Sequence, residues 1–120
     1  MTDDLPTLDL AALDRLLEMT GGDPAFVEEL IETFLDDAAK QLAAMNAAAT
    51  LGAADDLIRP SHSLKSNSAS VGAMRLSEMA RALEAASRDG DVAEASARVA
   101  AASSEFERVR EALKAHRAGS

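Results

Sequence analysis

The residues of this chain whose types and spacing could do chemistry lie in one short stretch, from Pro60 to Gly72. His62 is followed three positions later by Lys65, and most of the other side chains in the stretch are small. Because residues three and four apart are neighbours on a helix, Lys65, Ser66 and Ala69 would surround the imidazole on one face. The pattern predicts an exposed nitrogen nucleophile beside a fixed positive charge.

The segments around this stretch have the composition of helices. Alanine is abundant, residues that favour strands are few, and the only aromatic residues are three phenylalanines. Asp9, Asp23 and Asp91 are typical N-cap residues, and Pro24 suits the first position of a helix. The expected helices are a short one over about 9–20 and longer ones over about 23–49, about 53–70, between Gly72 and Gly90, and from 91 onward.

Apolar and small residues recur at alternating steps of three and four along the longer segments, as in a helix with one buried stripe. The expected stripes are Val27, Ile31, Phe34, Ala38, Leu42, Met45 and Ala49; Ala54, Leu57, Ser61, Leu64, Ser68 and Val71; Leu76, Met79, Leu83 and Ala86; and Val92, Ala95, Val99, Ala102, Phe106, Val109 and Leu113. The connections are short, which makes neighbouring helices run in opposite directions. The predicted fold is all-α, an up-down antiparallel four-helix bundle with a short additional N-terminal helix.

Two residues of the third expected helix affect its backbone. Gly72 follows the last stripe residue and is expected to be a structural cap that ends the helix. Pro60 lies inside the helix, where it cannot donate a backbone hydrogen bond to residue 56. A local bend is therefore predicted at Pro60.

A hairpin centred on Gly72-Ala73 would bring together residues whose numbers sum to about 144. Ser61 then lies level with Leu83, and the other expected stripe residues of the two helices also pair with each other. His62 is one position past Ser61, and Glu84 is one position past Leu83, at the flank of the fourth helix. The carboxylate of Glu84 would be within reach of His62, where it could accept the Nδ1 proton and leave Nε2 as the free nucleophile.

Composition excludes several classes of function. A chain of 120 residues is expected to form one domain, and its formal net charge of −9 argues against nucleic acid or an anionic membrane as the partner. It has no cysteine and only two histidines, so no metal site is expected. No apolar run approaches the length of a membrane span, and the N-terminus lacks the pattern of a signal peptide. A cytoplasmic location is expected.

The stretch that begins at His62 resembles the signature of histidine phosphotransfer (HPt) domains. It reads His-Ser-Leu-Lys-Ser-Asn-Ser-Ala-Ser-Val-Gly-Ala, and the family motif runs His-x-Leu-Lys-Gly-small-small and on to Gly-Ala. In two places the chain departs from the family pattern, since Ser66 stands where Gly is common and Pro60 lies within the helix that carries the histidine. The resemblance extends over roughly Asp9 to Lys114 through Gly21-Gly22-Asp23, Phe26, Leu76, the Leu83-Glu84 pair, Phe106 and Leu113.

The resemblance implies a phosphocarrier of a two-component phosphorelay. His62 would accept a phosphoryl group from the aspartyl phosphate of one receiver domain and pass it to another. Lys65 would support the transfer electrostatically, since an ammonium at about 4 Å contributes roughly 1 to 4 kcal/mol between bulk water and a protein surface. Glu84 would orient His62, because some family members carry Glu or Gln in this place. The chain would need no cofactor of its own, and Mg²⁺ is expected on the partner receiver domain.

The surroundings of His62 are expected to be a docking surface. Ser63, Ser66 and Ala69 are small and would let the backbone of a receiver domain approach closely. The partners are expected to be receiver domains of response regulators or hybrid histidine kinases, with no nucleic acid and no membrane, and the chain is expected to be a monomer. The arginines of the fourth helix are expected to be mostly solvated: Arg75, Arg81 and Arg88.

A function of another class remains open beside this one. The chain could be a catalytically silent four-helix adaptor in which His62 is incidental. An autonomous histidine kinase is excluded by the length of the chain and by the absence of a phosphate-binding glycine loop, so no kinase activity is expected. The expected organisation is a flexible lead over 1–8, the HPt-like bundle over 9–117 and a tail over 118–120.

Overall fold

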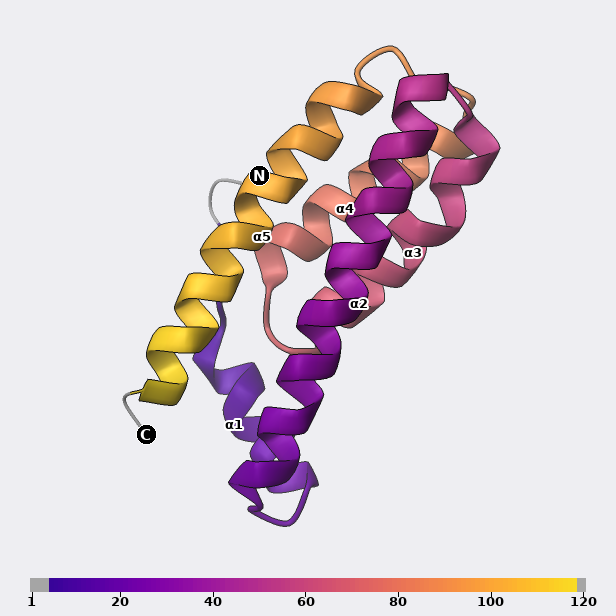
Figure 1. Cartoon of the computed structure of the whole chain (residues 1–120). Coiled ribbons are helices and arrows are strands. Elements are labelled where there is room, and N and C mark those ends of the chain that lie inside the picture. The colour runs from indigo at the N-terminus through magenta and orange to yellow at the C-terminus, as the bar shows by residue number, and fades with distance from the viewer. Residues whose placement is uncertain (1–4, 119–120) are drawn as a thin grey trace.

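The computed structural model describes residues 5–118, with side chains up to residue 116, and most of this part of the chain is helical. The helices are α1 (Leu10–Met19), α2 (Pro24–Leu51), α3 (Ala54–Ser70), α4 (Met74–Arg88) and α5 (Ala95–Ala118). Both α2 and α4 pack against α3 and α5, so the four long helices form a closed bundle, and α1 packs against α2 (Figure 1). No strand occurs between residues 5 and 118. The predicted all-α bundle with a short N-terminal helix is confirmed.

Local signals fix the ends of the first two helices much as expected. The carboxylates of Asp9 and Asp23 accept hydrogen bonds from the backbone two residues on, at 3.1 and 3.0 Å. Pro24 is the first residue of α2. This helix continues to Leu51, slightly beyond the expected end, and Gly52 terminates it in the left-handed region with φ of 65°.

The fifth helix begins later than the sequence indicated. Asp91 was expected to be its N-cap, but α5 starts at Ala95. The Asp91 carboxylate instead accepts a hydrogen bond from the backbone N–H of Ala93, at 3.2 Å, and so closes a turn before the helix. Aspartate stabilises both such turns and helix N-caps by the same type of hydrogen bond. The sequence alone therefore does not show which of the two Asp91 forms. Val92 lies in this turn and packs against the core, although it is not part of the helix.

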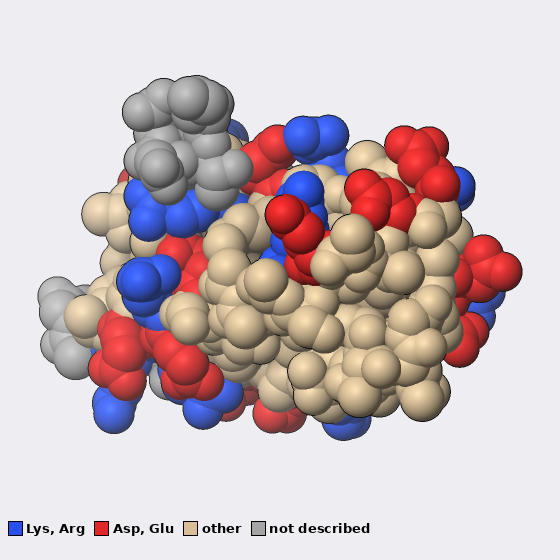
Figure 2. Space-filling model, turned by 90° about the horizontal axis from the view of Figure 1, so that it is seen from above, with Lys and Arg blue, Asp and Glu red and all other residues tan. Residues whose placement is uncertain are grey.

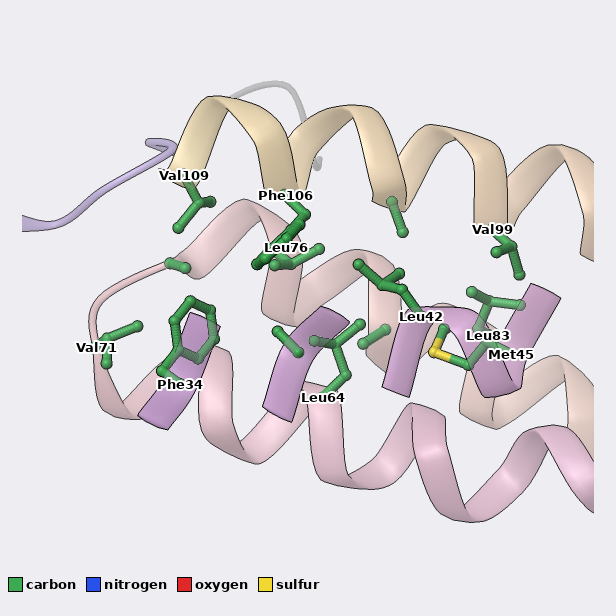
Figure 3. Packing of buried hydrophobic residues seen from close by; sticks show 14 of the residues in the cluster. Phe34, Leu42, Met45, Leu64, Val71, Leu76, Leu83, Val99, Phe106 and Val109 are labelled. Carbon is green, nitrogen blue, oxygen red and sulfur yellow. The ribbon is translucent and has the colours of Figure 1, made fainter. Parts of the chain in front are cut away.

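The core is built from the buried stripes of the four long helices. Phe34 of α2 and Phe106 of α5 contact each other edge to face, with ring centroids 6.3 Å apart and an angle of 63° between the rings (Figure 3). Edge-to-face pairs of this kind are favourable beyond the area that they bury. Buried residues of the predicted stripes include Ile31, Phe34, Ala38, Leu42, Met45, Leu57, Leu64, Val71, Val99, Ala102, Phe106, Val109 and Leu113.

The buried face of α4 differs from the prediction. Met79 and Ala86, which were expected in the core, are only partly buried. Helix α4 contacts both α3 and α5. It buries Ala80 and Ser87, each one position after a residue that was predicted to be in the core. Its buried residues are Leu76, Ala80, Leu83, Glu84 and Ser87. Glu84 is therefore part of the inward face, whereas the sequence predicted it at the flank of the helix.

Pro60 does not interrupt the helix that carries His62. Helix α3 is continuous from Ala54 to Ser70 with Pro60 inside it. The next residue, Ser61, is fully buried, so the helix keeps its inward face on both sides of the proline. The local bend at Pro60 stays a prediction.

Residues 5–9 are attached to the turn between α3 and α4. The backbone N–H of Asp9 donates to the carbonyl of Gly72 at 2.7 Å. Arg75 donates from its backbone N–H to the carbonyl of Pro6 at 3.3 Å and from Nε to the carbonyl of Leu5 at 3.1 Å. Residues 5–8 thus lie against the bundle, the flexibility predicted for residues 1–8 stays a prediction, and residues 1–4 lie outside the described part. At the other end α5 runs through Ala118, one residue beyond the predicted limit of the bundle.

Candidate functional site

His62 lies near the middle of α3, with its side chain directed towards α4. The side chain is 56% exposed, and its Nδ1 lies 2.9 Å from Oε2 of Glu84. Within the described residues, this is the hydrogen bond that the imidazole makes, and Nε2 makes none. One ring nitrogen is thus held by the protein, and the other is open to solvent.

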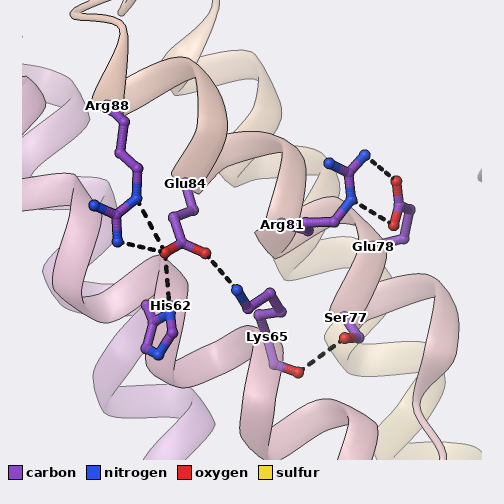
Figure 4. Close-up of polar contacts among 7 residues, drawn as sticks. All are labelled: His62, Lys65, Ser77, Glu78, Arg81, Glu84 and Arg88. Atoms are coloured by element: carbon purple, nitrogen blue, oxygen red, sulfur yellow. Dashed lines mark hydrogen bonds and ion pairs between the residues drawn. The ribbon is translucent and has the colours of Figure 1, made fainter.

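Glu84 is the centre of the polar cluster around His62 (Figure 4). Its Oε1 accepts a hydrogen bond from Nζ of Lys65 at 2.7 Å. Its Oε2 accepts from Arg88, with Nη2 at 2.8 Å and Nε at 3.3 Å, as well as from His62. The side chain of Glu84 is only 8% exposed, so these donors replace nearly all of the water around the carboxylate. The proximity of Glu84 and His62 that the hairpin arithmetic predicted is present.

The two cations keep this carboxylate ionised. The hydrogen bond from the Lys65 ammonium, followed by that from the Arg88 guanidinium, lowers the pKa of Glu84 from 4.5 to about 2, against the opposite effect of burial. An ionised carboxylate can only accept hydrogen bonds, so Nδ1 of His62 must carry the proton of their shared bond. The neutral imidazole then has its lone pair on the exposed Nε2.

A hydrogen bond from a side chain to the backbone joins α3 and α4 at the level of the site. The hydroxyl of Ser77 on α4 donates to the backbone carbonyl of Lys65 on α3, at 2.8 Å (Figure 4). The buried stripe of α3 contains two fully buried serines, Ser61 and Ser68, whose small side chains let the helices approach closely. This packing sets the distance between His62 and Glu84.

The other predicted site residues take different positions. Ser66 and Ala69 are exposed on α3, and Ser63 is partly exposed, so all three are accessible beside His62. Gly72 is buried at the α3–α4 turn, with φ of 83°. The backbone N–H groups of Gly72 and its successor donate to carbonyls of the last turn of α3 at 3.1 and 2.8 Å, which is the capping role predicted for this glycine.

Sequence reasoning missed the role of Arg88, which was expected to be solvated. Its side chain is 58% exposed, yet the guanidinium binds the buried oxygen of Glu84. The spacing of four between Glu84 and Arg88 was a signal for this pair, but such pairs are common on helix surfaces. The contact of Glu84 with α3 is what distinguishes this pair from an ordinary surface pair.

The described part of the chain offers no group of three or more His, Cys, Asp or Glu side chains arranged to hold a metal ion. None of the helices within residues 5–118 combines the length and the apolar character that crossing a bilayer requires.

Comparisons with known proteins agree with this geometry. The model of the Hpt domain family matches residues 29–119. Among solved structures, the chain is similar to the crystal structure of histidine-containing phosphotransfer protein B (HptB) from Pseudomonas aeruginosa PAO1, with 30% sequence identity and a TM-score of 0.87. That similarity covers 96% of this chain and 97% of the other. A comparison with curated protein sequences finds no match. The family match over most of the chain, together with the shared bundle, shows that the chain belongs to the Hpt domain family.

Proposed function

We propose that this chain is a histidine phosphotransfer protein of a phosphorelay and that Nε2 of His62 is its phosphoryl acceptor. The observation that carries the proposal is that the two imidazole nitrogens differ: Nδ1 is hydrogen-bonded to Glu84, and Nε2 is open to solvent. The second histidine, His116, lies near the end of α5, remote in sequence from the family motif. His62 is therefore the acceptor that the motif and the geometry both favour.

The transfer needs no proton to leave the imidazole. The lone pair of Nε2 attacks the phosphorus of an aspartyl phosphate on a receiver domain, and the bond between phosphorus and the aspartate oxygen breaks. The aspartate leaves as a carboxylate, and a nitrogen–phosphorus bond forms. In the next transfer, a carboxylate oxygen of another receiver domain attacks the same phosphorus, and the electron pair of the nitrogen–phosphorus bond returns to Nε2.

Glu84 supports the phosphorylated state as well as the nucleophile. Once Nε2 is bonded to phosphorus and Nδ1 retains its proton, the imidazole ring carries a positive charge. The ionised carboxylate of Glu84 lies 2.9 Å from Nδ1 and stabilises this charge. Lys65 supplies a cation next to the acceptor for the charge on the phosphoryl oxygens.

The partner is a receiver domain, which brings the rest of the chemistry. Phosphoryl transfer through an aspartyl phosphate calls for a divalent cation, and we assign this Mg²⁺ to the receiver domain that carries the aspartyl phosphate. The chain then acts as a phosphocarrier without kinase activity of its own, as a monomer, in the cytoplasm where receiver domains operate.

The surface near the site suits the docking of a protein. Ser63, Ser66 and Ala69 present small side chains beside His62. Residues 41–54, at the end of α2 and the turn into α3, include no charged residue, and Figure 2 shows a broad uncharged area at this end of the bundle. The centres of protein interfaces are likewise depleted in charged residues.

The direct test is transfer from a receiver domain that has been phosphorylated on its aspartate and freed of phosphodonor. The wild-type chain and His116→Gln should acquire label that is labile in acid and stable in base, and His62→Gln should acquire none. His62→Gln should keep its helical circular dichroism, because the side chain is more than half exposed. Normal acceptance by His62→Gln, or no acceptance by the wild type from any receiver domain of the same genome, would favour the silent adaptor instead.

A further inference from the structure

The cation that was expected to serve the phosphoryl group is bound to another anion in this structure. Nζ of Lys65 lies 2.7 Å from Oε1 of Glu84, and the lysine side chain is only 30% exposed. If Lys65 were the sole counter-ion of Glu84, its movement to a phosphoryl group would leave a nearly buried carboxylate without a charged partner. Leaving a charge unpaired at such a place is strongly unfavourable.

Arg88 removes this conflict because it binds the same carboxylate from the opposite side. Figure 4 shows Arg88 and Lys65 on either side of Glu84, with His62 between them. Arg88 donates two hydrogen bonds, from Nη2 at 2.8 Å and Nε at 3.3 Å, and both go to Oε2. Lys65 contacts only Oε1. The lysine could therefore turn away while Oε2 keeps a charged partner.

The charges of the site support the same conclusion. Before transfer, Lys65 and Arg88 face one carboxylate, which leaves an excess of one positive charge in a chain with a formal net charge of −9. After transfer, the positively charged imidazole ring and the two cations would balance the carboxylate and a phosphoryl dianion. Without Arg88, the phosphorylated site would carry one uncompensated negative charge close to the acidic pocket of the receiver domain.

We propose that Arg88 is a positioning residue that neutralises Glu84 and thereby frees Lys65 to turn to the phosphoryl group on His62. This inference rests on the proposed phosphotransfer function. Arg88 itself touches neither the nucleophile nor the phosphoryl group in this scheme and acts through the carboxylate. Its role differs from that of a surface ion pair because the carboxylate that it holds also determines the tautomer of His62.

A neighbouring arginine provides a matched control. Arg81 lies on the same helix, its side chain is 56% exposed, and it pairs with Glu78 three residues earlier. Its Nε donates to Glu78 at 2.8 Å, and neither residue contacts His62, Lys65 or Glu84. Arg81→Met removes the same charge from α4 as Arg88→Met and leaves the site intact.

The test measures the rate of transfer from one phosphorylated receiver domain to the unsubstituted protein and to three arginine variants, each in the wild-type and Glu84→Gln backgrounds. Arg88→Met should slow transfer about tenfold, the scale found when the partner of an active-site ligand is removed. Arg88→Lys should restore most of the rate, and Arg81→Met should stay within about twofold of wild type. In the Glu84→Gln background no carboxylate needs neutralising, so the effect of Arg88→Met should shrink to about twofold or less.

Several results would overturn the inference. Equal effects of Arg88→Met and Arg81→Met, or an undiminished effect of Arg88→Met in the Glu84→Gln background, would exclude action through Glu84. If Arg88→Met loses its helical circular dichroism, Arg88→Gln takes its place in the test. If the wild type accepts no phosphoryl group, the proposed function itself fails.

A second measurement does not depend on transfer. In the unphosphorylated protein, ¹⁵Nζ relaxation of Lys65 should show a more mobile ammonium in the wild type than in Arg88→Met, where Lys65 is the remaining cation on Glu84. Equal mobility in the two proteins would contradict the inference.

Discussion

At the level of single residues, the site depends on a carboxylate that stays ionised although it is almost hidden from water. The side chain of Glu84 is 8% exposed, and its negative charge is stabilised by Lys65 and Arg88. That charge makes Nδ1 of His62 a donor and leaves the lone pair on Nε2, the proposed nucleophile. The sequence already pointed to His62 as the nucleophile, whereas the side chains that orient it meet only through contacts between helices.

Glu84→Ala tests this orientation directly. Without the carboxylate, Nδ1 of His62 loses its acceptor, so the neutral ring should populate both tautomers more evenly. Transfer should slow about tenfold but survive, because Glu84 orients the imidazole and does not itself attack the phosphorus. Nitrogen-15 NMR of the ring reports the tautomers, and an unchanged ratio would mean that the contact does not hold in solution.

The low pKa of Glu84 also makes a prediction about acid. A folded-state pKa of about 2, below the ordinary 4.5, contributes stability that is fully present above pH 4.5 and is lost as the pH falls towards 2. Lys65 and Arg88 are partly open to water, which screens the interaction, so the contribution is about 1 kcal/mol. The fall in unfolding free energy between pH 7 and pH 3 should be smaller in Glu84→Gln than in the wild type by a little more than half of this amount, because the loss is complete only near pH 2. Equal falls in urea titrations would show that the ion pairs add no stability.

At the level of elements, the α3–α4 hairpin brings the reactive groups together. The sequence predicted it well because local signals fixed its turn at Gly72 and because Leu64, Leu76 and Leu83 pointed to one core. The prediction of the buried face was wrong for α4, which packs against both α3 and α5. A periodic pattern of apolar residues does not show how wide the buried face of a helix is. For that reason Glu84 was predicted at the flank of the helix, although it belongs to the inward face of α4.

The exposed face of α3 is predicted to receive the partner. Ser66 is exposed one turn after His62, so Ser66→Leu should keep the fold but obstruct the approach of a receiver domain. Transfer should slow at least about tenfold, on the scale of a lost interface anchor. Ser104→Leu, at an exposed position of α5, is the matched control and should transfer normally. Equal rates for the two variants would place the docking surface elsewhere.

At the level of the whole molecule, the chain N-terminal to α1 is connected to the turn that carries the hairpin. Asp9 donates to Gly72, and Arg75 donates to the carbonyls of Leu5 and Pro6. The sequence did not indicate this attachment, because backbone carbonyls carry no sequence signal and the segment contains no periodic pattern. The overall bundle was predictable, since its stripes and caps are local features of the helices.

Gly72→Ala should reveal how tightly this attachment packs. A Cβ at position 72 would lie 2.6 Å from the backbone oxygen of Asp9, in addition to the strain of φ at 83°. Gly90→Ala has a similar φ of 76° but meets no atom within 4 Å, so it measures the strain alone. The control should lose about 1 kcal/mol of unfolding free energy, and Gly72→Ala at least about 2 kcal/mol. Equal losses in denaturant titrations would show that the segment yields without cost.

In the proposed function the phosphoryl group resides on Nε2 of His62, because Glu84 occupies Nδ1. The measurement that tests it most directly is long-range ¹H–¹⁵N correlation with phosphorus coupling, on ¹⁵N-labelled protein phosphorylated by a receiver domain. We predict coupling of phosphorus to Nε2 of His62, a proton on Nδ1, and an unmodified His116. Phosphorus on Nδ1 of His62, or on His116, would contradict it.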